Sequence, residues 1–431
     1  MKGYTGFYFR LLLSALSLGV AWSLRGYFGH EQGAAWAGAL GVMMLLVLAD
    51  REDWNKRLTS ITALSAIGFG TGGMMSYGQL VRYVKADDPL NVAFGLFSLF
   101  LVGAIYGFIG GGFTGLSLES SPAKKPDWSR LVVEMFVAGF LFWGLLIYQL
   151  EWFMTPPRSE LWASCLGASA ALGWFLYRQG FHKGLKVALF TSLGCGFGFA
   201  IGCFLESLTE SLSTMPDLWR FMDYSLGFFG GLGMAYAIFS EDWPVSQPPD
   251  KAANLLGWLM IILIIPSINI IQNMDQDRLL SRANLHGLLD IAHFISATRK
   301  LSLFSLIIFP AVLSWSYRKQ LKGIYVWKRQ QVLMLFTFLM AWLITLSHLF
   351  SAAWMGENIG LQIMYWLYLF LLVIGSLFSS KFRISYPSTH SYQKLWLRLS
   401  ITVLVVIGLL LLVLLNAHHG QLGAQHRFIT E

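Results

Sequence analysis

The sequence predicts an all-α integral membrane protein with about 13 transmembrane helices. Of its 431 residues, 55% are hydrophobic and only 13% are charged, whereas a soluble domain usually carries about 25% charged residues. Apolar stretches of spanning length recur along the whole chain. The 17 Trp and 16 Tyr residues fit the aromatic belts at the two membrane interfaces.

Thirteen apolar stretches approach the roughly 20 residues that a transmembrane helix needs. They are residues 8–24, 34–49, 61–83, 92–117, 131–150, 161–177, 185–205, 222–240, 253–272, 300–317, 331–352, 359–379 and 396–416. An odd number of spans places the two termini on opposite sides of the membrane.

The basic residues predict the orientation. With a cytoplasmic N-terminus, 21 of the 31 Lys and Arg residues fall in inner segments, as the positive-inside rule requires. The outer connections are acidic or neutral, as at residues 87–88 and 275–277. We therefore expect a bacterial inner-membrane or plasma-membrane protein whose N-terminus is cytoplasmic and whose C-terminus is outside. This distribution explains the net charge of +8 without a nucleic-acid partner.

The three cysteines, Cys165, Cys195 and Cys203, lie inside apolar stretches. Their spacing matches neither a disulfide framework nor a metal site. We expect no cofactor. The partners that the sequence predicts are the lipid bilayer, a small polar solute and, for the glycine-rich faces, a helix-packing partner subunit.

An internal repeat divides the predicted chain. A shift of 126 residues matches Trp36 with Trp162 and aligns the glycines at 68, 70 and 72 with those at 194, 196 and 198. Because four spans separate the copies, they would be parallel repeats related by an axis along the membrane normal. We expect repeats at residues 1–120 (spans 1–4) and 121–243 (spans 5–8), followed by a five-helix C-terminal module at 244–431.

Glycine rows occupy several spans, at residues 68–73, 107–115 and 194–202. Glycines three or four residues apart let helix backbones approach closely, so the rows predict tight helix packing. Alternatively, helices thinned by glycine line a pathway or bend during transport. A dinucleotide-binding loop is excluded, because no glycine row follows a soluble strand.

A polar turn separates the first two apolar stretches. Residues 11–49 number only 39, so two helices of about 20 residues leave nothing for an exposed loop. Arg25, His30 and Glu31 should therefore form one polar cluster beneath the outer headgroups, where charge is costly and usually functional. With Gln32, these residues are candidates for substrate binding or for an outer gate.

Glu151 holds the position in the second repeat that Arg25 holds in the first, and it is a further candidate for binding or gating. An unpaired guanidinium at this depth would be costly. We therefore expect Arg25 to have Glu31 or Glu151 within salt-bridge reach.

Acidic residues near the span ends are either interfacial or candidates for ion coupling, since a coupling carboxylate must be dry in one state. These are Glu134, Glu206 and Asp223.

Polar residues recur along one face of residues 278–297, which predicts an amphipathic helix on the outer surface. His286, Asp290 and His293 share that face and are weak metal-ligand candidates. Three ligands from a single helix rarely surround an ion, so the sequence favours a solvated face and predicts no metal site.

These features favour a secondary transporter, a permease for a small polar solute that is ion-coupled or facilitative. Glycine-interrupted segments at corresponding places in two halves are typical of transport sites. An intramembrane transferase is one alternative; it would act on a lipid-linked or outer-face substrate with His30, His286 or His293 as base. A non-catalytic subunit of a membrane complex is another. The sequence favours a transporter over an enzyme and does not identify the substrate.

Overall fold

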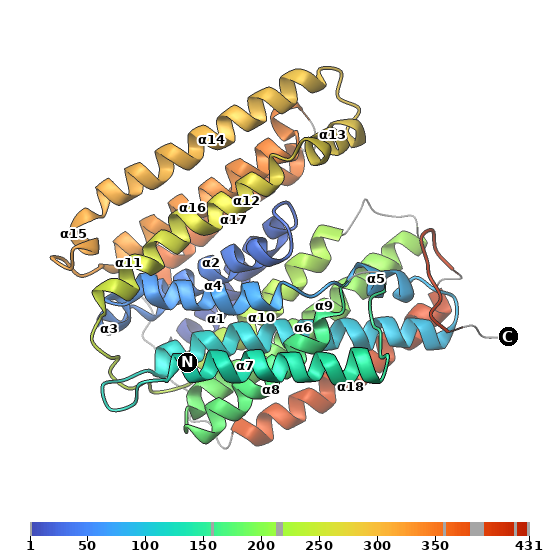
Figure 1. Cartoon of the computed structure of the whole chain (residues 1–431), viewed down its shortest axis with the longest axis horizontal. Coiled ribbons are helices and arrows are strands. Elements are labelled where there is room, and N and C mark those ends of the chain that lie inside the picture. The colour runs from blue at the N-terminus through green and yellow to red at the C-terminus, as the bar shows by residue number, and fades with distance from the viewer. Residues whose placement is uncertain are drawn as a thin grey trace.

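The computed structural model describes residues 2–156, 159–212, 219–356, 359–379, 392–417 and 420–428, and within them it is built of helices joined by loops, with no strand. Two π-helical segments, η1 (Gly144–Gln149) and η2 (Met260–Ile264), continue α7 and α11, and a short 3-10 helix, η3 (Ala353–Met355), follows α16. In chain order the helices are α1 (Lys2–Arg25), α2 (Glu31–Ala49), α3 (Glu52–Asn55), α4 (Leu58–Gly72), α5 (Gly78–Val84), α6 (Pro89–Glu119), α7 (Trp128–Trp143), α8 (Leu161–Arg178), α9 (His182–Leu212), α10 (Trp219–Phe239), α11 (Lys251–Leu259), α12 (Ile265–Asn273), α13 (Gln276–Leu285), α14 (Ile291–Ser316), α15 (Arg318–Leu321), α16 (Arg329–Phe350), α17 (Ile359–Ser379) and α18 (Tyr392–Ala417) (Figure 1).

Ten helices in the described part of the chain are long and apolar enough to cross a membrane. They are α1, α2, α6, α7 with η1, α9, α11 through α12, α14, α16, α17 and α18. The other predicted stretches lie on α4, which has only 15 residues, and on α8 and α10. The chain is therefore a helical membrane protein, whereas the count of 13 spans stays a prediction.

Six helices form a closed ring at the centre of the molecule. Each packs on the next in the order α1, α2, α4, α6, α9 and α10, and α10 packs back on α1. The interior of the ring is filled by aromatic side chains. Trp22 of α1 makes edge-to-face contacts with Phe69 of α4 and, across the ring, with Tyr106 of α6, at centroid distances of 5.5 and 5.7 Å. All three side chains are fully buried.

The predicted glycine rows lie where ring helices touch. A Cβ atom at Gly107 would lie 2.3 Å from the Thr191 carbonyl oxygen, and one at Gly198 would lie 2.3 Å from that of Ser225. Such distances leave room for hydrogen atoms only. The expectation of tight helix packing is confirmed for the α6/α9 and α9/α10 contacts.

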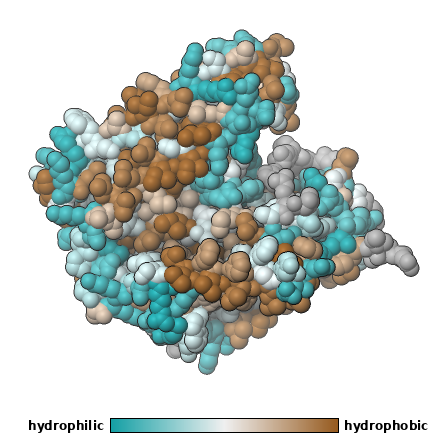
Figure 2. Space-filling view, in the orientation of Figure 1, coloured by the Kyte–Doolittle hydropathy of each residue, from teal (hydrophilic) through white to brown (hydrophobic). Residues whose placement is uncertain are grey.

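Two further layers flank the ring. Figure 1 shows α12, α14 and α16 above it and α7, α8 and α18 below it. Their outer faces are apolar and exposed. The most apolar window of α18 is only 11% buried, compared with 89% for α2. Figure 2 shows hydrophobic surface over both flanking layers. Apolar surface on this scale marks a membrane-facing or partner-facing side, and helices of this length identify lipid as the natural neighbour.

The loops that were predicted to be cytoplasmic meet at one end of the bundle, here called the basic end. Arg51 donates hydrogen bonds to the carbonyl groups of Trp243 and Pro244. Arg57 donates to Ser246 Oγ at 2.7 Å. These contacts join the α2–α4 connection to the α10–α11 connection, so the predicted grouping of these loops is confirmed.

The opposite end, here called the pocket end, carries the connections predicted to be outside. The last described residues also lie there, since the Gln421 amide donates to the Lys85 carbonyl oxygen at 3.0 Å. The start of α1 lies toward the basic end, because Arg10 donates a hydrogen bond to the Leu48 carbonyl. The described ends of the chain therefore lie at opposite ends of the bundle.

The predicted third span, residues 61–83, is wrong as a single helix. Helix α4 ends at Gly72, residues 73–77 form a loop, and α5 begins at Gly78. The loop continues toward the centre of the pocket end instead of leaving the protein, and Tyr77 in it is 2% exposed.

The predicted amphipathic helix at 278–297 is also wrong. Helix α13 ends at Leu285, and Gly287 has a φ of +60°. Asp290 then caps α14 by accepting a hydrogen bond from the His293 amide at 2.9 Å. A helix break therefore separates His286 from the other two metal-ligand candidates.

The packing does not show the two-fold relation expected of the repeats. A two-fold rotation that places spans 1–4 on spans 5–8 would exchange α1 with α7 and α6 with α10. The contact between α1 and α10 would then have a counterpart between α7 and α6. Within the described residues α7 packs mainly on α8, and extensive contacts of α6 are with α9, α4 and α5. Parallel symmetric packing of two four-helix units is therefore not the arrangement of the ring.

Candidate functional site

The candidate site lies at the pocket end, where two turns pack together. Residues 26–30 join α1 to α2, and residues 73–77 join α4 to α5. Gly73 permits the contact, because a Cβ atom there would lie 2.6 Å from the His30 carbonyl oxygen. The turns hold the rings of His30 and Tyr77 edge to face, with centroids 5.1 Å apart.

Arg25, the last residue of α1, is the centre of a buried polar cluster. Its Nη2 atom donates to Asp223 Oδ1 of α10 at 2.6 Å and to the Tyr77 hydroxyl at 2.7 Å. Its Nη1 atom donates to His30 Nδ1 at 3.2 Å. The side chains of Arg25 and Asp223 are 1% and 0% exposed. This is a fully desolvated ion pair that joins α1 to α10 and closes the ring.

The cluster fixes the tautomer of His30. A guanidinium group has no acceptor, so His30 Nδ1 must accept the hydrogen bond from Arg25. The neutral imidazole then carries its proton on Nε2. His30 is therefore a hydrogen-bond donor at Nε2.

Asp223 uses its two oxygen atoms differently. Oδ1 binds Arg25, whereas Oδ2 is buried and has no hydrogen-bond partner among the residues that the structure describes. Gly26 leaves space beside Oδ2, since a Cβ atom at Gly26 would lie 3.0 Å from both Asp223 Oδ2 and Arg220 Nη1. Arg220 itself stacks on the ring of Tyr27, 3.4 Å from its centroid.

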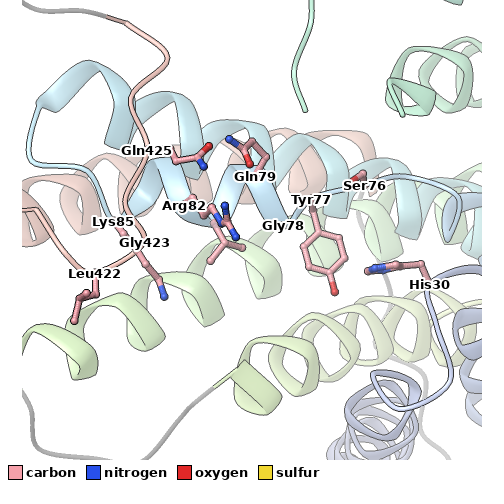
Figure 3. A pocket seen from close by; sticks show the side chains of 11 residues that line it. His30, Ser76, Tyr77, Gly78, Gln79, Arg82, Lys85, Leu422, Gly423 and Gln425 are labelled. Atoms are coloured by element: carbon pink, nitrogen blue, oxygen red, sulfur yellow. The ribbon is translucent and has the colours of Figure 1, made fainter. Parts of the chain in front are cut away.

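A cavity of about 690 Å³ reaches this cluster at its inner end. Figure 3 shows Tyr77 and His30 together on one side of it and Arg82 on the other, beneath the amides of Gln79 and Gln425. The lining residues come from both turns, from α5 and from the C-terminal segment: His30, Ser76, Tyr77, Gly78, Gln79, Val81, Arg82, Lys85, Leu422, Gly423 and Gln425. A cavity of this size accommodates a small molecule.

Lys85 is a cation of the cavity whose charge is compensated by carboxylates. It forms ion pairs with Glu206 at 3.4 Å and with Glu210 at 2.7 Å. Burial acts to lower the pKa of Lys85, but the hydrogen bond to Glu210 and the charges of both glutamates outweigh it and raise that pKa. Lys85 therefore stays protonated at neutral pH and its charge is compensated.

The C-terminal segment, residues 420–428, forms one wall of the cavity. The Gln425 amide donates to the Arg82 carbonyl oxygen at 3.2 Å. The Phe428 backbone N–H donates to Asn91 Oδ1 at 3.0 Å. The side-chain Nδ2 of Asn91 donates to the Phe428 carbonyl oxygen, also at 3.0 Å. This segment is folded back over α5 and the start of α6.

The structure brings together some of the predicted site residues and not others. Arg25 and His30 lie in the buried cluster. Gln32 is half-buried at the second position of α2, whereas Glu31 and Glu151 are exposed. The expected carboxylate beside Arg25 exists, but neither Glu31 nor Glu151 supplies it. Asp223 does, because ring closure places α10 next to α1.

The coupling candidates also separate. Asp223 is part of the cluster. Glu206 forms an ion pair with Lys85, which lines the cavity. Glu134 lies toward the basic end, where it binds Arg130 and Arg178 at 2.8 and 2.7 Å. This position makes Glu134 a surface ion-pair residue.

His286, Asp290 and His293 do not converge in the described structure. The close group of three ligand-type side chains found there is instead Asp87, Asp88 and His426. Asp88 caps α6 by accepting a hydrogen bond from the Asn91 backbone N–H at 2.9 Å. His426 Nδ1 lies 3.0 Å from Asp88 Oδ2. These contacts hold the C-terminal segment in place.

Tyr77 and Arg82 are site residues that sequence reasoning missed. Both lie within residues 61–83, which the hydropathy pattern assigned to one span. The signal was present in the run Gly72-Gly73-Met74-Met75-Ser76-Tyr77-Gly78-Gln79, where three glycines and a serine in eight residues favour a turn over a helix interior.

Comparison of the chain with protein-family models, with curated proteins and with solved structures found no match.

Proposed function

We propose that this chain is a secondary transporter, a permease that carries a small polar solute through the six-helix ring. The observation that carries the proposal is a buried ion pair whose hydrogen-bonded neighbours His30 and Tyr77 line a cavity at one end of the bundle. The aromatic side chains of Trp22, Phe69 and Tyr106 fill the interior of the ring and block a path through it. A site reached from one side and blocked on the other is what alternating access requires of each state.

Asp223 is the proposed coupling residue. Its Oδ2 atom is buried and has no hydrogen-bond partner in the described part of the chain, so this atom can take a proton or a small cation. Neutralising Asp223 would weaken its hold on Arg25 and loosen the contact between α1 and α10. Coupling of ion binding to helix movement would then use one side chain.

The test is uptake by proteoliposomes that contain only the purified chain. Solutes are presented as mixtures, with and without an inward proton or sodium gradient, and internal solutes are identified by mass spectrometry. We expect at least one small polar solute to enter faster than into empty liposomes. If no solute enters under any gradient, while a lipid-linked substrate is turned over, the transporter proposal is overturned in favour of a transferase.

The proposal includes the number of spans, their orientation and an internal duplication. We propose 13 spans with a cytoplasmic N-terminus, and a duplication in sequence that divides the chain into residues 1–120, 121–243 and 244–431. The grouping of the basic loops at one end supports the orientation. The recurrence of glycines after 126 residues supports the duplication, although the packing of the two halves differs.

Cysteine labelling checks the orientation. The three native cysteines are buried, so a new surface cysteine gives the signal. Leu422→Cys at the pocket end should react with an impermeant maleimide added outside intact cells. Glu52→Cys at the basic end should react only after permeabilisation, although both positions are exposed. The reverse pattern would invert the orientation and place the cavity on the cytoplasmic side.

A further inference from the structure

We infer that the solute is an anion, bound through a carboxylate or phosphate group by Arg82 of α5. This inference rests on the proposed function in taking the cavity at the pocket end as the solute site. It concerns what the cavity binds, which can be measured without transport.

The charges of the cavity point to an anion. Among the residues that the structure describes, its ionisable lining residues are His30, Tyr77, Arg82 and Lys85, and none of these is a carboxylate. Lys85 is compensated by Glu206 and Glu210. Arg82 is exposed and makes no ion pair within the described residues. The cavity therefore presents one uncompensated guanidinium, whose planar fork suits carboxylate and phosphate oxygens.

The neutral groups add hydrogen-bond donors. Gln79 and Gln425 flank Arg82 (Figure 3), and each amide carries two N–H donors. His30 lies on the other side of the cavity, and any hydrogen bond that it donates comes from Nε2, because its Nδ1 accepts from Arg25. An oxygen-rich anion uses such donors, whereas an organic cation would meet Arg82 with no carboxylate among the described lining residues to offset it.

The backbone holds Arg82 in place. Helix α5 packs on α6 so closely that a Cβ atom at Gly95 would lie 2.7 Å from the Val84 nitrogen. The carbonyl group of Arg82 also accepts a hydrogen bond from Gln425. The guanidinium therefore projects from a fixed position, so that little backbone ordering opposes binding.

Binding is measured by titration calorimetry on the full chain in phosphatidylcholine nanodiscs. The probes are succinate, inorganic phosphate, choline and glucose. We expect succinate or phosphate to bind and choline to fail. Arg82→Gln should weaken anion binding about 10- to 100-fold, as loss of a charge-assisted hydrogen bond predicts. Arg278→Gln is the matched control, since Arg278 is exposed at the same end of the bundle.

Nanodiscs with added phosphatidylglycerol separate a free anion from a lipid headgroup. If phosphatidylglycerol blocks succinate and phosphate binding to the wild type, the occupant is a headgroup; if it does not, the occupant is a free anion. Unchanged anion affinity in Arg82→Gln, or binding of choline or glucose alone, overturns the inference. Anion binding without uptake of any solute leaves the inference standing and overturns the transporter proposal.

Discussion

Arg25→Ala is expected to abolish solute uptake and to destabilise the protein by about 3–5 kcal/mol, because it strands the buried Asp223 carboxylate without a partner. Arg25 is 1% exposed and binds Asp223, Tyr77 and His30 at once. Arg25→Lys should restore uptake only in part, since an ammonium group keeps the charge but loses the planar fork. Uptake per folded molecule and melting temperature in detergent measure the two effects separately.

A double variant separates transport from folding. Replacing a buried ion pair by apolar residues of similar volume is often neutral or stabilising, so Arg25→Met with Asp223→Leu should recover the melting temperature. Uptake should remain lost, because the proposed coupling carboxylate is gone. The control is Lys56→Met at the exposed Glu52–Lys56 pair, where an effect of about 0–1 kcal/mol is expected. Wild-type uptake by the double variant would exclude the ion pair from the mechanism.

The sequence predicted the depth of Arg25 but not its partner. Residues 11–49 are too few for two spans and an exposed loop, which predicts that Arg25 is buried. The structure confirms this burial. The count says nothing of neighbours in space. Asp223 lies 198 residues further along the chain, and it reaches Arg25 only because α10 closes the ring against α1.

The error in the predicted third span has a physical cause. Hydropathy averages over about 19 residues, so it does not resolve an apolar helix that stops early. Gly72 and Gly73 end α4 within such a window, and the loop that follows is buried by contacts with residues 26–30. A buried loop looks like a continued span in composition, although its backbone is not helical.

The grouping of the basic loops at one end was within reach of the sequence, because charge in a membrane protein is sorted by side. Arg51 and Arg57 were assigned to one side from their type and position alone. The structure places them beside residues 243–246, which belong to another connection assigned to the same side. Contact partners such as Trp243 still needed the fold.

Gly194→Ala is expected to be strongly destabilising, although it adds only a single methyl group. The added carbon would lie 2.1 Å from the carbonyl oxygen of Phe229 and 2.7 Å from its carbonyl carbon, whereas non-bonded carbons are optimal at about 3.5–4.0 Å. Backbone atoms cannot turn aside as a flexible side chain can. Helices α9 and α10 must separate, which also opens the contacts of Gly198 and Gly202 with α10.

Overpacking a core usually costs about 1–3 kcal/mol, and we expect Gly194→Ala to reach or exceed the upper end, with a lower melting temperature and less folded protein in detergent. Gly408→Ala in α18 is the matched control. Open space surrounds Gly408, and alanine is the better helix former by about 1 kcal/mol, so this variant should melt at or slightly above the wild-type temperature. Equal melting temperatures for Gly194→Ala and the wild type would contradict the close α9/α10 contact. Because that contact holds α10 in the ring, they would also remove the basis for pairing Asp223 with Arg25.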